Sequence, residues 1–179
     1  MKRILITGAT GNIGIEVLNY LNELNSGNEI IAAVRNIAKA KKALKKYDDC
    51  LYRTFDIENP NTFSAAFNNI DTLFLLRPPH ISEIDKYIVP LFKEAKKSGI
   101  TNVVFLSVQG AEKSKVIPHN KIEKFIQGFG FNYVFVRPSY FMQNLTTSLL
   151  PEIKSKKCIT LPSGKAKFNW IDTKNIGAM

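Results

Sequence analysis

The sequence predicts an α/β fold in which a parallel sheet carries helices on both faces. Short apolar runs typical of buried strands alternate with segments of helical spacing along the chain. The first apolar run, Ile4–Ile6, ends in the glycines Gly8, Gly11 and Gly14, and a helical pattern follows at once. This order predicts a doubly wound sheet with right-handed crossovers and a ligand at the carboxyl ends of its strands.

Each element is expected from its own local pattern. The apolar runs predict strands at 4–6, 30–34, 51–55, 71–76, 102–107 and 133–136. The helical patterns lie at 12–25, 37–47, from 59 onward, 82–98 and 119–128, with Ser82 as the cap of the fourth helix. A short strand at 168–172 and the first turn of a helix at 173–178 are expected last.

Composition limits the class of protein. The 179 residues suit one globular domain, and no apolar run approaches the 18 or so residues of a membrane span. The net charge of +10 lies mostly in the last third and is not interleaved with aromatic residues, so no nucleic-acid partner is expected. Cys50 and Cys158 lack metal or redox spacing and are expected to be buried, reduced thiols. We therefore expect a cytoplasmic protein without a metal or a membrane partner.

The glycine spacing indicates a site for a dinucleotide. Gly8 can make the turn, Gly11 can let the backbone approach a pyrophosphate, and Gly14 can let the helix pack on the strand. The first helical turn offers free N–H groups to the anion. A chance glycine cluster in a solvent turn is the alternative. The residues expected to bind the cofactor here are Gly8, Thr10, Gly11, Asn12, Ile13 and Gly14. The spacing Gly-x-x-Gly-x-x-Gly resembles that of the short-chain dehydrogenase/reductase superfamily.

Arg35 indicates which dinucleotide is preferred. An acidic residue at the end of the second strand suits the ribose hydroxyls of NAD, whereas an arginine suits the 2′-phosphate of NADP. Arg35 occupies that position, and Lys39 follows one helical turn later. The sequence therefore favours NADP(H) over NAD(H), with a plain surface arginine as the alternative.

The later strand ends supply the rest of the predicted cofactor site. Asp56 and Ile57 follow the third strand, where short-chain reductases bracket the adenine ring, although Asp56 could equally cap the next helix. Leu76 and Arg77 end the fourth strand, and Ser107 ends the fifth. The fold would place these loops over the ribose and the nicotinamide.

A wider resemblance covers the full length. Val34-Arg35-Asn36, the segment 69–74, the segment 136–144 and the segment from Trp170 to Gly177 together resemble the NmrA-like family of atypical short-chain reductases. That family includes NADPH-dependent quinone reductases and NADP(H)-sensing regulators. The resemblance implies a nucleotide-binding domain at 1–150 and the start of a truncated substrate-binding region at 151–179. Relatives of this family continue beyond this point with the rest of the substrate-binding region. We therefore expect this chain to expose apolar surface and to tend toward homo-oligomers.

The resemblance leaves the catalytic group open. The Tyr-x-x-x-Lys pair of ordinary short-chain dehydrogenases does not occur anywhere in the chain. His119, at a position where some quinone reductases of the family carry histidine, could donate a proton with Lys121 nearby, or it could only line the cleft. Tyr140, Phe141 and Asn144 could form the substrate wall, although Tyr140 and Phe141 could equally belong to the core.

Two functional hypotheses follow. The first is a reductase that passes hydride from NADPH to a small acceptor such as a quinone. The second is a regulator that senses NADP(H) without turnover and acts through a protein partner. A sugar-nucleotide epimerase is a weaker third, because that chemistry needs the missing tyrosine and lysine.

Overall fold

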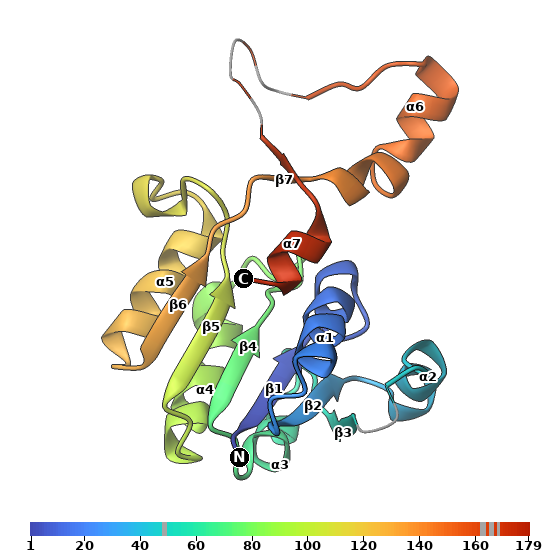
Figure 1. Ribbon diagram of the computed structural model, residues 1–179. Coiled ribbons are helices and arrows are strands. Elements are labelled where there is room, and N and C mark those ends of the chain that lie inside the picture. The colour runs from blue at the N-terminus through green and yellow to red at the C-terminus, as the bar shows by residue number, and fades with distance from the viewer. Residues whose placement is uncertain (48–49, 162–163, 165–166, 168) are drawn as a thin grey trace.

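Six parallel strands form the centre of the molecule. The computed structural model describes residues 1–47, 50–161, 164, 167 and 169–179. The sheet has the strand order β3-β2-β1-β4-β5-β6, with β1 in the middle (Figure 1). Its strands are β1 (Arg3–Thr7), β2 (Glu29–Val34), β3 (Leu51–Thr54), β4 (Thr72–Leu75), β5 (Asn102–Leu106) and β6 (Asn132–Val136). The predicted α/β, doubly wound architecture is confirmed, and each predicted strand of the sheet agrees with the structure to within a residue or two.

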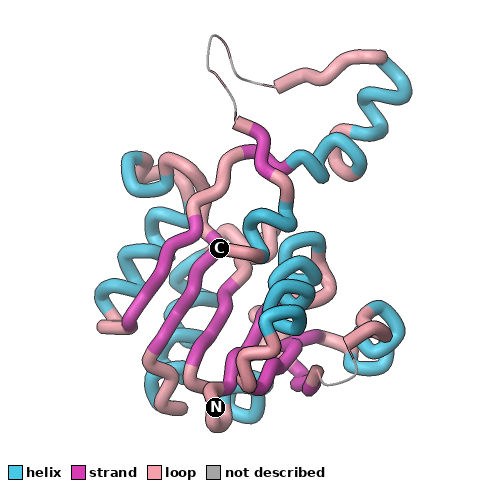
Figure 2. Tube along the Cα trace, in the orientation of Figure 1, coloured by secondary structure: helices cyan, strands magenta, loops and turns pink. Residues whose placement is uncertain are grey.

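Helices cover both faces of this sheet (Figure 2). Helices α1 (Asn12–Leu24) and α2 (Ile37–Ala43) pack their buried residues into one apolar cluster with β1 and β2. Helices α3 (Phe63–Phe67), α4 (Ile84–Lys97) and α5 (Pro118–Gly128) pack into a second cluster on the opposite face. Three short 3-10 turns complete the main connections, at Pro60–Thr62, Ala111–Lys113 and Met142–Thr146.

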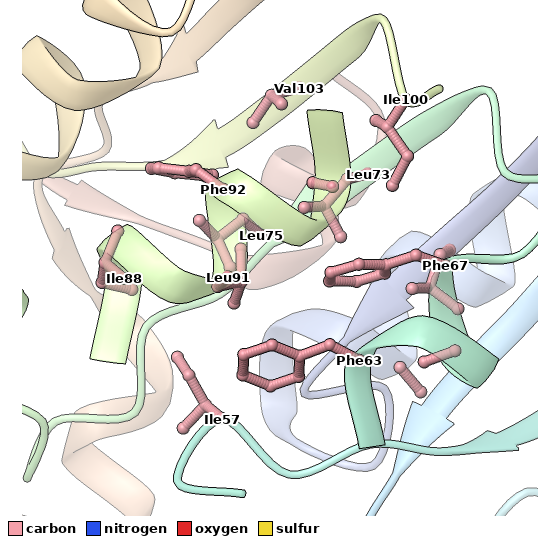
Figure 3. Packing of buried hydrophobic residues seen from close by; sticks show 14 of the residues in the cluster. Ile57, Phe63, Phe67, Leu73, Leu75, Ile88, Leu91, Phe92, Ile100 and Val103 are labelled. Atoms are coloured by element: carbon pink, nitrogen blue, oxygen red, sulfur yellow. The ribbon is translucent and has the colours of Figure 1, made fainter. Parts of the chain in front are cut away.

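The second cluster shows why these sequences form buried strands. Leu73 and Leu75 of β4 and Val103 of β5 point into it together with Phe63, Phe67 and Phe92 of the helices (Figure 3). The rings of Phe63 and Phe67 lie 5.8 Å apart, within the range of favourable aromatic contacts. Since strands covered on both faces need apolar side chains throughout, short continuous apolar runs mark them in the sequence.

Two local predictions need correction. Ser82 does not cap α4: the residue before the helix is Glu83, and no side chain there makes a capping hydrogen bond. The Ser82 carbonyl instead accepts from the Ile84 N–H at 2.9 Å, so the chain makes a tight turn before the helix begins. Helix α2 ends at Ala43 rather than at residue 47, and Leu44 and Tyr47 are buried in non-helical turns. Burial of these two side chains therefore overrides the helical pattern.

The last part of the chain returns to the sheet domain. Strand β7 (Tyr140–Phe141) pairs in parallel with β8 (Trp170–Ile171), and α7 (Thr173–Gly177) then packs on α1. A Cβ atom at Gly177 would lie 2.5 Å from the Glu16 carbonyl oxygen, so the two helix backbones touch there. Helix α6 (Leu150–Lys156) lies on an arm away from the sheet (Figure 1). Residue Phe168 of the predicted strand lies outside the described residues.

Three further expectations concern exposure. The described part of the chain contains no helix with the length and apolar character that a membrane crossing requires.

Both cysteines are free, but Cys50 is half-buried and Cys158 is exposed, so the prediction of two buried thiols is wrong. Cys158 lies two residues after the end of α6, the helix that Figure 1 shows on an arm away from the sheet. Tyr133 and Val134 of the edge strand β6 are 46% and 57% exposed, while self-association stays a prediction.

Gly14 gives a direct test of the packing between β1 and α1. A Cβ atom there would lie 2.2 Å from the Gly8 carbonyl oxygen and 2.6 Å from the Ala9 Cα, and neither backbone atom can move freely. We expect Gly14→Ala to lower the free energy of unfolding by at least about 2 kcal/mol, measured by urea denaturation. Gly128→Ala is the matched control, because no atom lies within 4 Å of its Cβ position. Equal stability of the two variants would contradict the packing argument.

Candidate functional site

A cleft of about 540 Å³ lies at the carboxyl edge of the sheet. Residues at or just beyond the ends of five strands line it: Thr7, Val34, Phe55, Leu76 and Leu106. The chain leaves β1 toward β2 on one side and returns to β4 on the other, so the strand order reverses at this point. Ligands of doubly wound folds bind at such a reversal. A smaller cavity of about 130 Å³ lies at the far end of α1 and contains none of the predicted site residues.

The glycine turn forms the floor of the cleft. Gly8 has a φ of +63°, and its carbonyl accepts a hydrogen bond from the Gly11 N–H at 2.9 Å. Gly11 occupies the cap position of α1, where it offers no side chain, and the first turn carries no acidic residue. The first N–H groups of α1 are therefore left for an anion. Thr10, Asn12 and Ile13 line the cleft together with Gly8 and Gly11, whereas Gly14 is buried and is not among the lining residues.

Thr7 holds the turn against the neighbouring strand. Its hydroxyl accepts from the Leu76 N–H at 2.8 Å and donates to the Phe74 carbonyl at 3.1 Å. Thr7 is a cleft residue that sequence reasoning missed. The available signal was its place as the last residue of a buried strand, directly before the first glycine.

The structure separates the two cations predicted for a 2′-phosphate. Arg35 follows β2 directly, is exposed, and lines the cleft. Lys39 lies on α2, its backbone N–H bound to the Asn36 side chain at 2.9 Å, and is not among the lining residues. Arg35 is thus the better placed of the two for a ligand in the cleft.

Asp56 and Ile57 line the next part of the wall. The Asp56 carboxylate accepts from the Glu58 N–H at 3.1 Å, while Asn59 caps the following turn. Asp56 thus stabilises its loop without being the helix cap. Across the cleft, His80 lies 3.4 Å from Glu58, and both of these residues line the cleft and were missed from the sequence. Glu58 lies four residues beyond β3 and His80 five residues beyond β4, where loop shape decides which side chains face inward.

Arg77 is held tightly at the end of β4. One terminal nitrogen of its guanidinium donates to the carbonyls of Pro78, Pro79 and Ile81 at 3.0, 3.0 and 2.7 Å. Burial lowers the pKa of Arg77 from its usual value. Arg77 lines the cleft beside Leu76, as its position after the strand predicts.

Ser107 is not exposed to the cleft. It is 1% exposed, and its hydroxyl donates to the Glu123 carboxylate at 2.5 Å. Arg137 binds the same carboxylate with two nitrogens, at 3.0 and 2.8 Å. Burial opposes ionisation of Glu123, but the hydrogen bonds from Arg137 and Ser107 outweigh it, so the net effect is a lowered pKa. This network ties α5 to the ends of β5 and β6. The sequence could have indicated it, because Glu123 lies between the apolar residues Ile122 and Ile126 on the buried face of a helix.

The two predicted catalytic residues point to different environments. His119 is half-buried on α5, and its ring stacks on Phe105 with centroids 5.8 Å apart. Burial, aided by the positive charge of Arg77, lowers the pKa of His119 to about 4. Lys121 is exposed and pairs with Asp85 of α4. Neither side chain is among the residues that line the cleft.

The predicted substrate wall is partly assembled. Phe141 of β7 and Asn144 of the following turn both line the cleft. Phe141 also packs against the apolar cluster of α1, so it is a wall and a core residue at once. The Tyr140 ring meets Trp170 of β8 edge to face at 5.0 Å, and this residue is not in the lining.

The strand order and the glycine turn at the strand reversal define a Rossmann-type dinucleotide-binding fold. The chain belongs to the NmrA-like family, because the sequence model of that family matches residues 1–179. The resemblance drawn from the sequence is thereby confirmed.

Three proteins illustrate what the chain is similar to. It is 29% identical to Prestalk A differentiation protein A of Dictyostelium discoideum, over 97% of this chain and 56% of that protein. It is also 29% identical to NAD(P)H azoreductase of Xenophilus azovorans, over 98% of this chain and 61% of the relative. The solved structure of Citrobacter sp. triphenylmethane reductase complexed with NADP(H) has a TM-score of 0.81 at 23% identity, over 98% of this chain and 63% of that one. The chain thus spans about three fifths of their length.

The Glu123 network predicts a defined pH dependence of stability. The folded-state pKa of Glu123 lies below its unfolded value of about 4.3, so its contribution to folding is present above that pH and is lost as the pH falls through the folded value. Arg137→Met leaves the buried carboxylate without its cation. We expect it to lower the free energy of unfolding by about 3 kcal/mol at neutral pH, measured by urea denaturation.

The loss should shrink as the pH falls through the lowered folded-state pKa of Glu123, below which the carboxyl group is protonated in both proteins. Lys124→Met, an exposed substitution on α5, should change stability by less than about 0.5 kcal/mol. A loss in Arg137→Met that does not vary with pH would contradict the assignment to Glu123.

Proposed function

We propose that the cleft binds NADP(H) and that the protein reduces a small acceptor such as a quinone. The observation that carries this proposal is the glycine turn with the uncapped start of α1, opening into a cleft whose wall includes Arg35. The NADP(H) in the solved triphenylmethane reductase complex and the NAD(P)H of the azoreductase name support a nicotinamide cofactor in this fold.

Each part of the cleft has a role in this proposal. The N–H groups of the glycine turn and of Asn12 and Ile13 bind the pyrophosphate. Arg35 binds the 2′-phosphate through charge-assisted hydrogen bonds. Asp56 and Ile57 bracket the adenine, and Leu76 and Arg77 border the ribose and nicotinamide. Lys39 and Ser107 act from outside the lining, Lys39 as an added positive charge and Ser107 by holding the end of β5.

In this proposal the acceptor lies against Leu106, Phe141 and Asn144 of the lining. Two apolar side chains and one amide suit a flat organic acceptor. When bound, NADPH supplies the hydride. The side chains of this chain orient the acceptor and exclude water. His119 is neutral at physiological pH, so it can take part only as a neutral imidazole.

The second candidate function is a sensor that binds NADP(H) without turnover and acts through a protein partner. Two observations favour it. The Tyr-x-x-x-Lys pair is missing, and Lys121 is engaged with Asp85 outside the cleft. The reductase would act on a small molecule, and the sensor would act on a regulatory protein, in both cases in the cytoplasm. A homo-oligomer is a further expectation.

Arg35 tests the cofactor preference. We expect Arg35→Ala to weaken NADPH binding by about tenfold to a hundredfold, as loss of a charge-assisted hydrogen bond does, and to leave NADH binding little changed. Fluorescence titration of the purified chain with each nucleotide gives the two dissociation constants. Lys39→Ala, one turn away and outside the lining, should change NADPH binding by less than about threefold. An equal loss of both nucleotides in Arg35→Ala would refute a 2′-phosphate role.

Turnover separates the two candidate functions. A reductase should oxidise NADPH steadily when menadione is added, and the rate should saturate with both substrates. A sensor should bind NADPH tightly and show no acceptor-dependent oxidation. Absence of both binding and turnover would refute the cofactor assignment for this chain.

A further inference from the structure

The short turn that follows β7 carries part of the cleft wall. Phe141 ends β7, and Asn144 lies in the 3-10 turn Met142–Thr146 that comes next. Both side chains line the cleft, whereas Gln143 between them is not among the lining residues. The pairing of β7 with β8 covers only Tyr140 and Phe141, so it does not reach the turn. The contact that fixes this turn decides where its side chains stand in the cleft.

The side chain of Gln143 makes such a contact. Its Nε2 donates to the Asp172 carboxylate at 2.8 Å, and its Oε1 accepts from the backbone N–H of Thr173 at 3.1 Å. An ionised carboxylate can only accept and an N–H can only donate, so the two hydrogen bonds define one orientation of the amide. Gln143 is half-buried, and both ends of its amide are used.

Asp172 and Thr173 form the start of α7, which is a well-anchored helix. Asp172 caps it by accepting from the Lys174 N–H at 2.9 Å, and Thr173 is buried. At its other end α7 packs on α1, where the Gly177 backbone touches that of Glu16 (Figure 1). Since α1 begins at the glycine turn, α7 has a defined place relative to the floor of the cleft.

Hydrogen bonds within the turn connect Gln143 to the rest of it. The backbone carbonyl of Gln143 accepts from the hydroxyls of Thr146 and Thr147 at 3.1 and 2.8 Å. The Asn144 carbonyl accepts at 2.9 Å from the N–H of Leu149, whose side chain is buried. The turn is therefore held as one unit, and a shift of Gln143 would move Asn144 with it.

We propose that Gln143 is a positioning residue, which holds Phe141 and Asn144 in a fixed place relative to the glycine turn by tying their segment to the start of α7. The tie joins the segments 136–144 and 170–177, which are distant in sequence. This proposal rests on the proposed function, because the side chains that Gln143 places are those against which the acceptor lies. Through α7, helix α1 then holds both the acceptor wall and the floor that binds the pyrophosphate.

Amide hydrogen exchange tests the tie without turnover. Gln143→Met keeps the length of the side chain and removes both of its hydrogen bonds. We expect this variant to speed exchange of the Thr173 amide, and of the Leu149 amide within the turn, by at least about tenfold, measured by NMR. Gln127→Met on α5 is the matched control: it also removes a side-chain hydrogen bond, to Tyr133, but lies outside the cleft lining and should leave both amides unchanged. Unchanged exchange at Leu149 in Gln143→Met would overturn the proposal, because other contacts would then hold the turn.

Kinetics test the consequence for the acceptor. We expect Gln143→Met to raise KM for menadione by at least about tenfold, since a small misplacement of the groups that orient a substrate is costly. The affinity for NADPH should change by less than about threefold, because the glycine turn and Arg35 are untouched. A variant that was only less stable would lower kcat through a smaller folded fraction and leave KM unchanged. An unchanged KM, or an equal loss of affinity for NADPH, would overturn the proposal.

A paired substitution tests the tie by rescue. Gln143→Glu places a second carboxylate against Asp172, and the repulsion should raise KM for menadione at least as much as Gln143→Met does. Adding Asp172→Asn supplies a donor to the new carboxylate and keeps a residue type that caps helices well. We expect the double variant to return KM to within about threefold of the wild-type value. A double variant as impaired as Gln143→Glu alone would contradict the tie.

The two proposals fail in different ways. If the wild type neither binds nor oxidises NADPH, the proposed function is refuted. The exchange rates of the Thr173 and Leu149 amides then still decide whether Gln143 holds the turn.

Discussion

The contact between the backbone of α1 and the turn that precedes it is the constraint on which the rest of this molecule depends. Gly14 lies where any side chain would meet the Gly8 carbonyl and the Ala9 backbone. Because the helix starts this close to the strand, its first N–H groups open at the centre of the carboxyl edge. At the same edge the Thr7 hydroxyl ties β1 to β4, the neighbouring strand at the point where the strand order reverses.

Two kinds of interaction hold the rest of the sheet and its carboxyl edge in place: apolar packing and a buried charged network. Apolar packing determines the layers, as the clusters on the two faces of the sheet show. A buried charged network determines the corner at β5 and β6, where Glu123 joins Ser107 and Arg137. The second device costs desolvation, but each carboxylate oxygen is hydrogen-bonded, and such networks favour one arrangement over its alternatives. His119 lies four residues before Glu123 on the same helix, and burial together with the positive charge of Arg77 lowers its pKa.

The strands and the glycine turn could be predicted because their signals are local. Continuous apolar runs mark strands buried on both faces, and the three-residue glycine spacing marks a turn that only glycine permits. The ends of elements were less accessible: the Ser82 cap was wrong, since a turn before α4 takes up that residue, and α2 stopped early because Leu44 and Tyr47 are buried outside the helix. The division into 1–150 and 151–179 stays a prediction, although α7 packs on α1 across it.

The sequence by itself determined the fold class, the position of the cleft and the residues within two positions of a strand end, such as Arg35, Asp56 and Arg77. Those properties depend on chain order and on backbone conformation, which neighbouring residues control. Only the tertiary structure decided that Ser107 faces Glu123, that Lys121 faces Asp85, and that burial lowers the pKa of His119. Side-chain direction and pKa depend on groups brought together from distant parts of the chain, and their local sequence carries no record of that encounter.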